Sequence, residues 1–454
     1  MPAPISRALA DFAAGLTYDR LPPLAVEAVN TGMADTVGVM FSGIGMSVSR
    51  QAHAIAATRG LSGEARIYFG AERASTADAA LVNAATTSSV VFDDVAFAGC
   101  HTSTVLMPAL IAEAELHGRS GKDVITAYAA GYEAWARLSE REPDSYAGKG
   151  WHATACFGPL AAALAISNLH RYDAATTLRA IGIAASMSGG ITASFDTDVG
   201  PFQIARGTAG GVMAARLAKS GMTAPEDGLE RAGRGMMAAL SPKGSVDLDT
   251  PMTDLGSSWR LETIGINVKQ YPSGNMNQRA TDGVLDLVLA HDVKPEQVAR
   301  VEMLISEAQH AVISKSPSVI HFVPSHSYRL AAAAAIIARR AGFAELEEPF
   351  WGRADVQAMM QKADLVIDPS IAADTQPNLG LSGGTRLHLA DGRVLESPPV
   401  SFARGHWTRR MSEAELLGKF VTCASAHLDT ASAERLFGQI YRLERVANIN
   451  ELNA

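Results

Sequence analysis

Two histidines precede apolar segments in the same local sequence pattern. His101 and His152 each begin the pattern His-x-[Ser/Thr], which is followed by four residues and then a proline, Pro108 or Pro159. A proline is favoured at the first position of a helix, where its missing N–H group has no intrahelical partner to lose. The pattern therefore predicts two helices that begin near these prolines, with a histidine just before each.

A histidine at a helix start is placed for proton chemistry. Unpaired backbone N–H groups and the helix dipole attract carboxylates and disfavour an imidazolium ion, so the imidazole stays neutral and can accept a proton. Ser103 and Thr154 are expected to accept hydrogen bonds from backbone donors in the same turns. Two such positions indicate proton transfer on a small organic acid. The structural alternative is two cap-region histidines whose hydrogen bonds are satisfied.

The composition limits the classes of partner and the location. The chain has 454 residues, of which 47% are hydrophobic and 19% charged, and its net charge is −8. An acidic chain without a run of Lys or Arg does not fit a nucleic-acid-binding protein. The longest apolar stretch, residues 330–338, is too short to cross a membrane, and residues 1–16 lack the features of a signal peptide. We therefore expect a cytoplasmic protein with neither a nucleic-acid nor a membrane partner.

The three cysteines are Cys100, Cys156 and Cys423, and none belongs to a Cys-x-x-Cys pair. They are too few for a disulfide framework, which fits a reducing compartment. Cys100 directly precedes His101, so a nucleophilic thiolate is one interpretation. We prefer the other, an inert small hydrophobic residue, because a thiol needs a lowered pKa to react.

Residues 1–266 read as one helix after another. Apolar residues recur at helical spacing in segments near 24–41, 78–87, 109–116, 124–138, 160–169 and 174–188. Alanine, glycine and serine dominate the inward positions, so we expect close packing, with the middle helices buried on all sides. The glycines of residues 207–211 are interpreted as close helix contacts. Residues 65–69 are the one strand predicted in this part.

Residues 267–409 have a different pattern. Strands are predicted at 300–306, 365–368, 385–389 and 393–396, the last two joined by a hairpin at Asp391-Gly392. Helices are predicted at 278–290, 328–341 and 353–363, and residues 412–446 are helical again. The predicted fold is mainly α. It combines a large all-helical domain (residues 1–266 and 410–454) with a smaller α+β lid domain (residues 267–409).

Motifs for several common cofactors are absent from the sequence. No G-x-x-x-x-G-K-[ST] phosphate loop, H-E-x-x-H zinc motif, G-x-S-x-G nucleophile motif or strand–G-x-G-x-x-G–helix unit occurs. We therefore predict neither a bound cofactor nor a metal site, which leaves proton transfer by side chains.

A series of short motifs runs along nearly the whole chain. They are Phe92-Asp93-Asp94, residues 150–154 (GWHAT) with Phe157-Gly158, residues 200–218, residues 269–272 (KQYP), residues 325–328 (SHSY), Gly405-His406 and residues 416–420 (LLGKF). Together and in this order they resemble the MmgE/PrpD family. The resemblance implies a helical domain with an α+β lid, a homodimer and no cofactor. The activities it implies are 2-methylcitrate dehydration, cis-aconitate decarboxylation and iminodisuccinate epimerisation.

The chain also departs from that family's usual pattern. Where the resemblance implies an Asp, a Thr, an active-site Lys, a Cys or His, and a Thr-His pair, the chain has Val91, Val95, Gly200, Gly274 and Asn277-Gln278. These changes alter the charge and shape of the pocket, so the resemblance leaves the substrate open. Arg206 and Arg279 are candidates to supply the missing positive charge. Surface salt bridges are the alternative for both.

The polar residues that remain define the candidate catalytic groups. His101 or His152 is expected to remove the α-proton of a small carboxylic acid, with both rings facing one cavity. Lys269 and the helix N-termini are expected to hold carboxylates and to stabilise enediolate-like charge. Tyr328 is expected to protonate a leaving group or to hold a carboxylate, with packing at its helix start as the alternative.

Four further residues are weighed beside them. Asp93 and Ser103 are candidate substrate-binding residues. Adjacent carboxylates such as Asp93 and Asp94 usually point apart, which favours a turn or cap role for them. His326 is interpreted as a solvated or lid histidine.

The leading hypothesis is a cofactor-independent lyase, of dehydratase or decarboxylase type, that acts on a small di- or tricarboxylic acid. One alternative is an isomerase or epimerase of an amino-dicarboxylate such as iminodisuccinate, which needs two bases but no leaving-group acid. The other alternative is a catalytically silent member of the family that keeps the fold alone.

Overall fold

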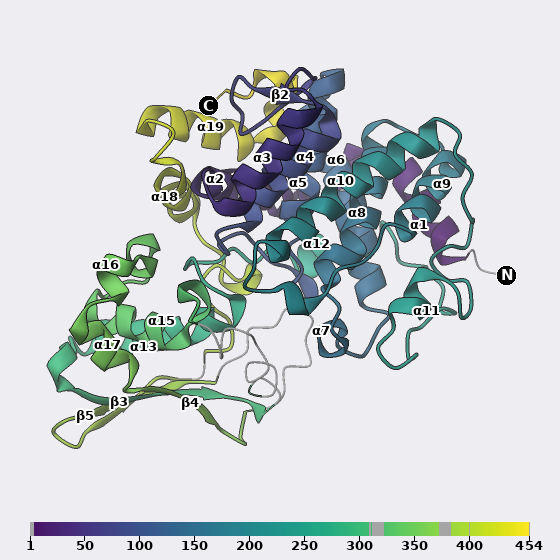
Figure 1. The fold of residues 1–454 in the computed structure, drawn as a ribbon. Coiled ribbons are helices and arrows are strands. Elements are labelled where there is room, and N and C mark those ends of the chain that lie inside the picture. Colours follow the sequence, from purple (N-terminus) through teal and green to yellow (C-terminus); the bar gives the residue numbers. More distant parts are fainter. Residues whose placement is uncertain (1–3, 308–309, 311–321, 372–382, 399, 454) are drawn as a thin grey trace. The chain divides into compact units, whose positions relative to one another are not determined.

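The computed structural model describes residues 4–307, 310, 322–371, 383–398 and 400–453, which divide into two compact units. Unit 1 comprises Met1–Ile266 and Ser412–Ala454, so the C-terminal segment packs with the N-terminal part of the chain. Unit 2 comprises Asn267–Met411. Figure 1 shows that unit 1 is built mainly of helices, whereas unit 2 combines helices with a sheet.

The main elements of unit 1 are helices that pack closely around one another. They are α1 (Ile5–Gly15), α2 (Pro23–Gly43), α3 (Ser47–Arg59), α4 (Thr76–Ser88), α5 (Thr102–His117), α6 (Gly121–Ser139), α7 (Tyr146–Lys149), α8 (Ala153–Leu169), α9 (Ala174–Ala185), α10 (Val199–Lys219), α11 (Met236–Leu240), α12 (Arg260–Thr263), α18 (Glu413–Ala424) and α19 (Thr430–Ile440). Short 3₁₀ turns lie at Tyr18–Arg20, Phe97–Gly99, Thr192–Ser194, Leu443–Arg445 and Ile449–Glu451.

Helix α8 is the buried centre of unit 1. Every residue of α8 from Thr154 onward is buried, and the helix contacts α5, α6, α9 and α10. Glycines permit this packing, because a Cβ added at Gly211 of α10 would lie 2.3 Å from the Cβ of Ala162. The prediction that these glycines serve close helix contacts is confirmed.

Helices α5 and α8 begin directly after their histidines and not near their prolines. His101 and His152 are the N-cap residues, while Pro108 and Pro159 lie inside the helices. An interior proline removes one backbone hydrogen bond and needs room for its ring. At Pro159 part of that room comes from Gly207, where an added Cβ would lie 3.3 Å from the proline Cδ. The predicted helix starts are therefore wrong. Each helix begins earlier than predicted, directly after its histidine.

The predicted strand at residues 65–69 is shorter than expected. Only its first part is extended, as β1 (Ala65–Arg66), and it pairs antiparallel with β2 (Arg73–Ala74), which the pattern does not predict. Tyr68 and Phe69 have φ angles of 55° and 57°. This left-handed conformation turns the chain, so the strand ends before these residues.

Unit 2 contains a four-stranded mixed sheet with helices packed on it. The strands β3 (Val298–Ile305), β4 (Ala363–Ile367), β5 (Thr385–Leu389) and β6 (Val394–Glu396) lie in the order β4-β3-β5-β6, with β4 parallel to β3 and the other pairs antiparallel. The helices are α13 (Gln278–Ala290), α15 (Tyr328–Ile337), α16 (Glu348–Trp351) and α17 (Ala354–Met360). Further 3₁₀ turns lie at Asn275–Asn277, Pro295–Gln297, Pro324–His326, Phe343–Leu346 and Trp407–Arg409.

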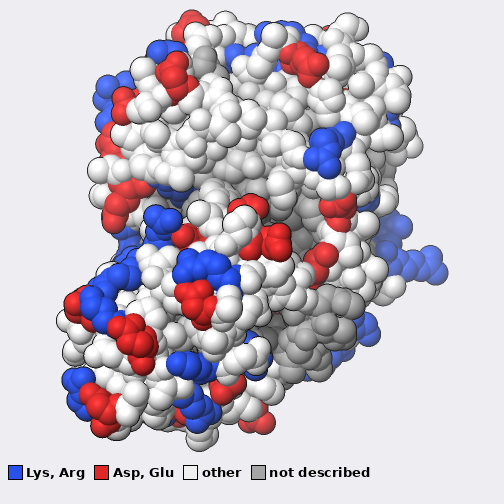
Figure 2. Space-filling model, turned by 60° about the vertical axis from the view of Figure 1, so that its left-hand side comes forward, with Lys and Arg blue, Asp and Glu red and all other residues white. Residues whose placement is uncertain are grey.

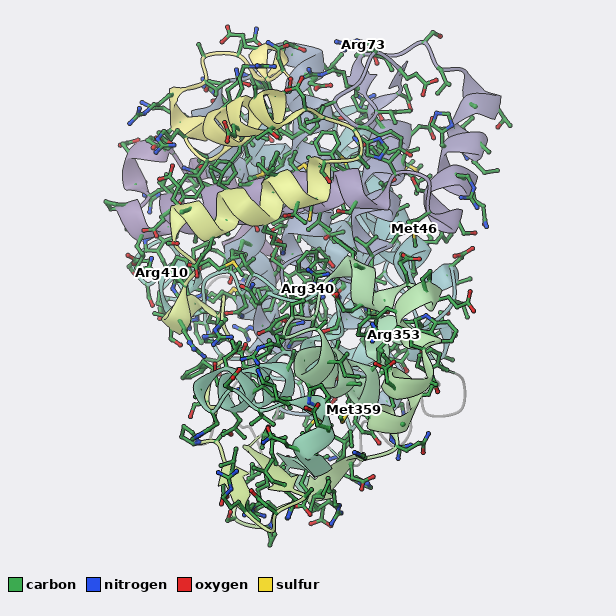
Figure 3. All side chains as sticks on the ribbon, turned by 90° about the vertical axis from the view of Figure 1, so that its left-hand side faces the viewer. Met46, Arg73, Arg340, Arg353, Met359 and Arg410 are labelled. Carbon is green, nitrogen blue, oxygen red and sulfur yellow. The ribbon has the colours of Figure 1, made fainter. Side chains whose placement is uncertain are left out.

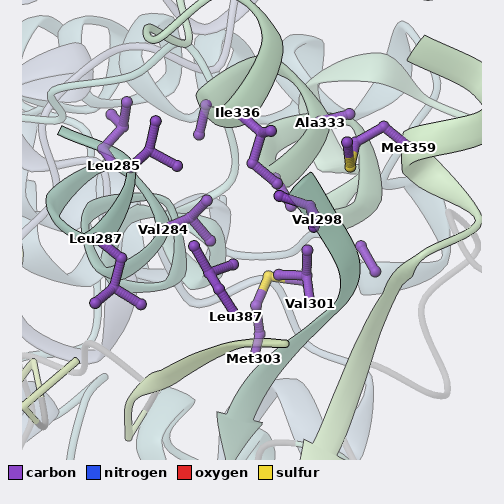
Figure 4. Packing of buried hydrophobic residues seen from close by; sticks show 14 of the residues in the cluster. Val284, Leu285, Leu287, Val298, Val301, Met303, Ala333, Ile336, Met359 and Leu387 are labelled. Atoms are coloured by element: carbon purple, nitrogen blue, oxygen red, sulfur yellow. The ribbon is translucent and has the colours of Figure 1, made fainter. Parts of the chain in front are cut away.

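The core of unit 2 lies between the sheet and the helices α13 and α15. Val301 and Met303 of β3 are buried in one cluster with Val284 of α13 and Ile336 of α15, as Figure 4 shows. The predicted class, mainly α with a smaller α+β part, is confirmed. The predicted hairpin is confirmed as well, since β5 and β6 pair antiparallel and Gly392 between them has a φ of 91°.

Two predicted helices of unit 2 are too long. Helix α15 ends at Ile337 rather than at residue 341, because Arg339 has a φ of 57°, outside the helical region. Helix α17 ends at Met360, since Ala363 already begins β4. By contrast, α13 spans the predicted residues 278–290.

In the part of the chain that the structure describes, each helix is too short or too polar to cross a membrane. On the face shown in Figure 2, the side chains of Lys and Arg are interspersed with those of Asp and Glu. Opposite charges therefore lie close together over this face.

Candidate active site

The two histidines that precede α5 and α8 lie next to each other. The ring centroids of His101 and His152 are 6.4 Å apart, and the rings are inclined by 78°. The backbone N–H of His101 donates to Thr154 Oγ1 (3.2 Å), which ties one helix start to the other. Neither imidazole caps its own helix. Both are therefore placed at the positive end of a helix dipole.

His101 is held by a buried carboxylate. Asp93 is fully buried, and its Oδ2 accepts hydrogen bonds from His101 Nδ1 (2.7 Å) and Thr104 Oγ1 (2.5 Å). Because a carboxylate oxygen only accepts, we assign the imidazole proton to Nδ1 and the lone pair to Nε2. The side chain of His101 is 20% exposed. The hydrogen bond fixes the tautomer of His101 and leaves Nε2 as an acceptor, which is what a general base requires.

His152 has different surroundings. It is 8% exposed, and its ring centroid lies 5.0 Å from that of Phe195. Its Nδ1 has no hydrogen-bond partner among the described residues. Burial, and then the nearby His101, lower the pKa of His152 to about 3. At neutral pH His152 is therefore an uncharged imidazole with one nitrogen that donates and one that accepts.

A second polar network lies behind the first histidine, around Asp94. The Oδ2 of Asp94 accepts from Ser103 Oγ (2.8 Å), and its Oδ1 accepts from Thr36 Oγ1 (3.1 Å). Ser103 Oγ also lies 2.7 Å from the hydroxyl of Tyr128. These four side chains come from α2, α5, α6 and the segment before α5, so the network fixes that segment against three helices.

The two neighbouring carboxylates have separate roles. Burial, followed by the charges of Asp35 and Asp93, raises the pKa of Asp94 well above its ordinary value. Asp94 binds hydroxyl groups in the interior, while Asp93 holds the imidazole. The predicted turn or cap role is wrong for both, because each binds side chains in the interior. Asp93 and Ser103 are fully buried and support the site from behind, rather than facing a substrate as predicted.

Comparison with known proteins gives the family. Residues 7–249 match the MmgE/PrpD N-terminal domain, and residues 271–442 match the MmgE/PrpD C-terminal domain. The chain belongs to the MmgE/PrpD family.

Several curated relatives of this MmgE/PrpD protein are named cis-aconitate decarboxylase. The protein of Homo sapiens is 26% identical over 389 residues, which cover 82% of this chain and 78% of the relative. The protein of Mus musculus is 24% identical over 467 residues, which cover 99% and 92%. That of Aspergillus terreus is 25% identical over 279 residues, which cover 58% and 56%. These relatives support lyase chemistry of the dehydratase or decarboxylase type at the level of the family, without assigning the substrate.

Three positions that depart from the MmgE/PrpD pattern, Val91, Val95 and Gly200, lie in unit 1, and Val95 is buried. Val91, two residues before Asp93, has a φ of 54°, which is unfavourable for a β-branched side chain and persists where the surroundings hold the chain. Gly200 is buried near the start of α10, and a Cβ there would lie 3.2 Å from the carbonyl oxygen of Ser194. A lysine at this position would therefore require the adjacent loop to shift.

The predicted residues Lys269 and Tyr328 belong to unit 2. Lys269 is buried, with 3% of its surface exposed. Tyr328 is half-buried, begins α15 and packs against the core of unit 2. Tyr328 therefore has the packing contacts that the alternative expects at its helix start. The roles of Lys269 and Tyr328 toward a substrate stay predictions.

Two other departures shape the chain that follows Lys269. The side chain of Gln278 accepts from the backbone N–H groups of Gln270 (3.1 Å) and Tyr271 (3.2 Å), and so holds this loop in place. A Cβ at Gly274 would lie 3.1 Å from Cδ2 of His326. His326 is half-buried and occupies space beside Gly274, and its interpretation as a solvated or lid histidine stays a prediction.

The two arginines proposed to compensate for lost charge differ. Arg206 donates to the carbonyl oxygens of Met187 (3.3 Å) and Gly189, and so holds this loop in place. The next carbonyl oxygen of the loop, that of Gly190, accepts from the backbone N–H of His152 (2.9 Å). Arg279 is 6% exposed, and its guanidinium carbon lies 5.9 Å from the centroid of the Phe402 ring. The surface alternative is therefore wrong for Arg279.

Sequence reasoning missed the hydroxyl groups that bind the two carboxylates. Thr104 lies three residues after His101, and residues at this spacing share one face of a helix, so a local signal for it existed. Thr36 and Tyr128 come from α2 and α6. No local pattern connects these two residues to Asp94.

Two remaining features of unit 1 do not add to the site. Burial raises the pKa of Cys100 to about 12, which confirms the interpretation as an inert thiol. A cavity of about 690 Å³ lies between α3 and α10, with mainly apolar walls that include Ile55, Phe202 and Met213. Neither His101 nor His152 is among its described lining residues, so the cavity does not define the candidate active site.

Proposed function

We propose that this protein is a lyase that acts on a small di- or tricarboxylic acid, with His101 as the group that transfers the proton. The observation that carries the proposal is the pairing of His101 Nδ1 with the buried Asp93, at a helix start beside the uncharged His152. The lyase relatives named cis-aconitate decarboxylase support the same class of reaction.

His101 has a defined task in both lyase reactions. In a dehydration, Nε2 accepts the α-proton, the C–H electron pair forms the new double bond, and the β-hydroxyl leaves as water after it receives a proton. In a decarboxylation, Nε2 of His101 first takes up a proton from solvent; the C–C bond then breaks, CO₂ leaves, the electron pair stays on the substrate carbon, and the imidazolium delivers its proton to that carbon. Asp93 stabilises the imidazolium in either case, because its anionic oxygen lies 2.7 Å from Nδ1.

The groups that hold the substrate are assigned by charge. The N-termini of α5 and α8 and the uncharged His152 supply hydrogen-bond donors for a carboxylate. We further propose that Lys269 neutralises a second carboxylate and that Tyr328 protonates the leaving group in a dehydration. No cofactor enters this scheme, because imidazole, ammonium and phenol groups suffice for each proton transfer.

An epimerase of an amino-dicarboxylate is the second candidate. Two imidazoles with centroids 6.4 Å apart suit a reaction in which one base removes a proton and another returns it on the opposite face. However, a His152 with a pKa of about 3 is rarely protonated at neutral pH. It is therefore a poor acid reservoir for the second step, and the lyase is preferred.

A panel of substrates tests the proposal. Cis-aconitate, 2-methylcitrate and iminodisuccinate are incubated with the wild type and with His101→Ala in D₂O, and products are followed by NMR. We expect the wild type to convert at least one acid with loss of CO₂ or water, and His101→Ala to lose this activity. Deuterium incorporation without such a loss would establish the epimerase instead. No turnover, together with no heat of binding by calorimetry, would contradict both and leave a silent family member.

A further inference from the structure

A lysine of the C-terminal helix is buried in unit 1, against the chain that leads to Asp93. The side chain of Lys419 is 8% exposed, and its Nζ lies 2.6 Å from Oδ1 of the buried Asp35. The same Nζ donates to the carbonyl oxygen of Phe92 (2.9 Å) and lies 3.8 Å from the centroid of the Phe92 ring. Figure 3 shows α18, which carries Lys419, alongside α2, which carries Asp35.

The contacts with Phe92 connect Lys419 to the candidate base. Phe92 directly precedes Asp93, and the carboxylate of Asp93 orients His101. A hydrogen bond to the Phe92 carbonyl and a cation over the Phe92 ring fix this residue from two directions. A side chain more than 300 residues away in the sequence thus contacts the residue directly before Asp93.

The charges around Phe92 and Asp93 also favour a role for Lys419 in holding this segment. Asp35, Asp93 and Asp94 are all buried, and three carboxylates so close in the interior repel one another. The ammonium group of Lys419 offsets part of this repulsion through its ion pair with Asp35. Burial of a lysine is costly unless the ammonium is paired, which the contacts with Asp35 and Phe92 achieve.

We propose that Lys419 is a positioning residue for His101, acting through Phe92 and Asp93. It holds the Asp93 carboxylate at the place where it fixes the imidazole tautomer. Its expected effect on turnover rests on the proposed function, whereas its effect on the His101–Asp93 hydrogen bond does not.

Three variants separate positioning from simple charge balance. Lys419→Met removes the ammonium. The double variant Asp35→Asn with Lys419→Met also removes the partner charge, so the protein keeps no uncompensated ion at this place and still lacks the donor to Phe92. Arg442→Met is the matched control. Arg442 forms an exposed ion pair with Glu413, the first residue of the helix that carries Lys419 (2.8 Å).

The main readout is the far-downfield proton resonance of His101 Nδ1–H, identified by its loss in His101→Ala. We expect Arg442→Met to keep this resonance, and both Lys419 variants to lose it or to exchange it faster with solvent. On a productive acid, both Lys419 variants are expected to lower kcat by about 10- to 100-fold with KM nearly unchanged, as for a misplaced catalytic group.

Each outcome decides the proposal. A double variant with the wild-type melting temperature that keeps the resonance and kcat would show that Lys419 only balances Asp35, and would overturn the proposal. If Lys419→Met does not fold, the double variant still gives the answer. If the wild type converts no acid, the proposed function fails, while the resonance alone still supports or overturns the positioning role.

Discussion

The starts of α5 and α8 share one sequence pattern but present their histidines in opposite settings. His101 is partly exposed and bonded to Asp93, whereas His152 is buried beside Phe195 and has a pKa of about 3. The shared pattern predicts the same role for both. The structure separates them, because His101 has a carboxylate partner and His152 packs beside a phenyl ring, and for this reason His101 is the one proposed to transfer the proton.

The difference arises from residues outside the pattern. An Asp lies eight residues before each histidine, Asp93 in one case and Asp144 in the other. Asp93 turns inward to His101, whereas Asp144 pairs with Lys243 (2.6 Å) at the surface. Equal spacing therefore does not imply an equal environment, because tertiary packing decides which carboxylate is enclosed with its histidine.

The largest effect is expected when the imidazole of His101 is removed. His101→Ala is expected to lower kcat/KM by about 10³-fold, since a positioned general base contributes on that order. Steady-state kinetics on the productive acid measure the loss. His53→Ala is the control, because His53 bonds to Glu72 away from the site (2.7 Å). Wild-type kinetics in His101→Ala would remove His101 from the mechanism.

Substitution of Asp93 and of Asp144, which lie eight residues before His101 and His152, tests whether the two histidines differ in their carboxylate partner. Asp93→Asn is expected to lower kcat by about 10²-fold or more, because the amide no longer stabilises the imidazolium or fixes the tautomer. Asp144→Asn, at the same offset from His152, is expected to leave kcat unchanged, since its carboxylate binds Lys243. Kinetics of both variants at several pH values provide the measurement. Equal losses in the two variants would contradict the assignment.

The pH dependence of stability tests the setting of His152. The folded pKa of about 3 lies below the ordinary value of 6.5, so the unfolded state binds the proton first as the pH falls. This group therefore destabilises the protein progressively below about pH 6.5, by roughly 3 kcal/mol at pH 4. Urea unfolding at pH 7 and pH 4 measures the change. His152→Gln should lose that much of the pH dependence, and an unchanged slope would refute the low pKa.

The smallest effects are expected at Cys100 and Cys156, the cysteines near His101 and His152 in the sequence. Burial raises the pKa values of Cys100 and Cys156 to about 12, so both remain thiols at neutral pH. Cys100→Ala is expected to change kcat by less than about twofold, because a neutral buried thiol is not a nucleophile. Steady-state kinetics and thiol alkylation at pH 8 measure this. Loss of turnover, or rapid alkylation of Cys100 in the folded protein, would speak against it.

Regular elements with a strong local pattern could be predicted from the sequence. The span of α13 and the hairpin at Asp391-Gly392 follow from periodicity and turn chemistry. The starts of α5 and α8 could not be placed correctly, because the proline rule assumes a first-turn position. Here Pro108 and Pro159 are accommodated inside the helices, and at Pro159 the space comes from a glycine on another helix.

The candidate site could be predicted only in part. The chemistry and motif of His101 and His152 single them out in the sequence, and the structure brings them together. The residues that contact the surrounding chain, among them Tyr128 and Lys419, come from distant helices, so no spacing connects them to Asp93 or Asp94. Which aspartate is buried with its histidine is a result of packing and not of local sequence.

Chemical rescue tests the central claim most directly. Free imidazole is added to His101→Ala and to His152→Ala at saturating concentrations of the productive acid, and initial rates are measured against imidazole concentration. The account predicts that imidazole restores turnover of His101→Ala in a concentration-dependent manner, because the missing function is a proton-transfer group beside Asp93. Undiminished turnover by His101→Ala without imidazole, or rescue confined to His152→Ala, would contradict it.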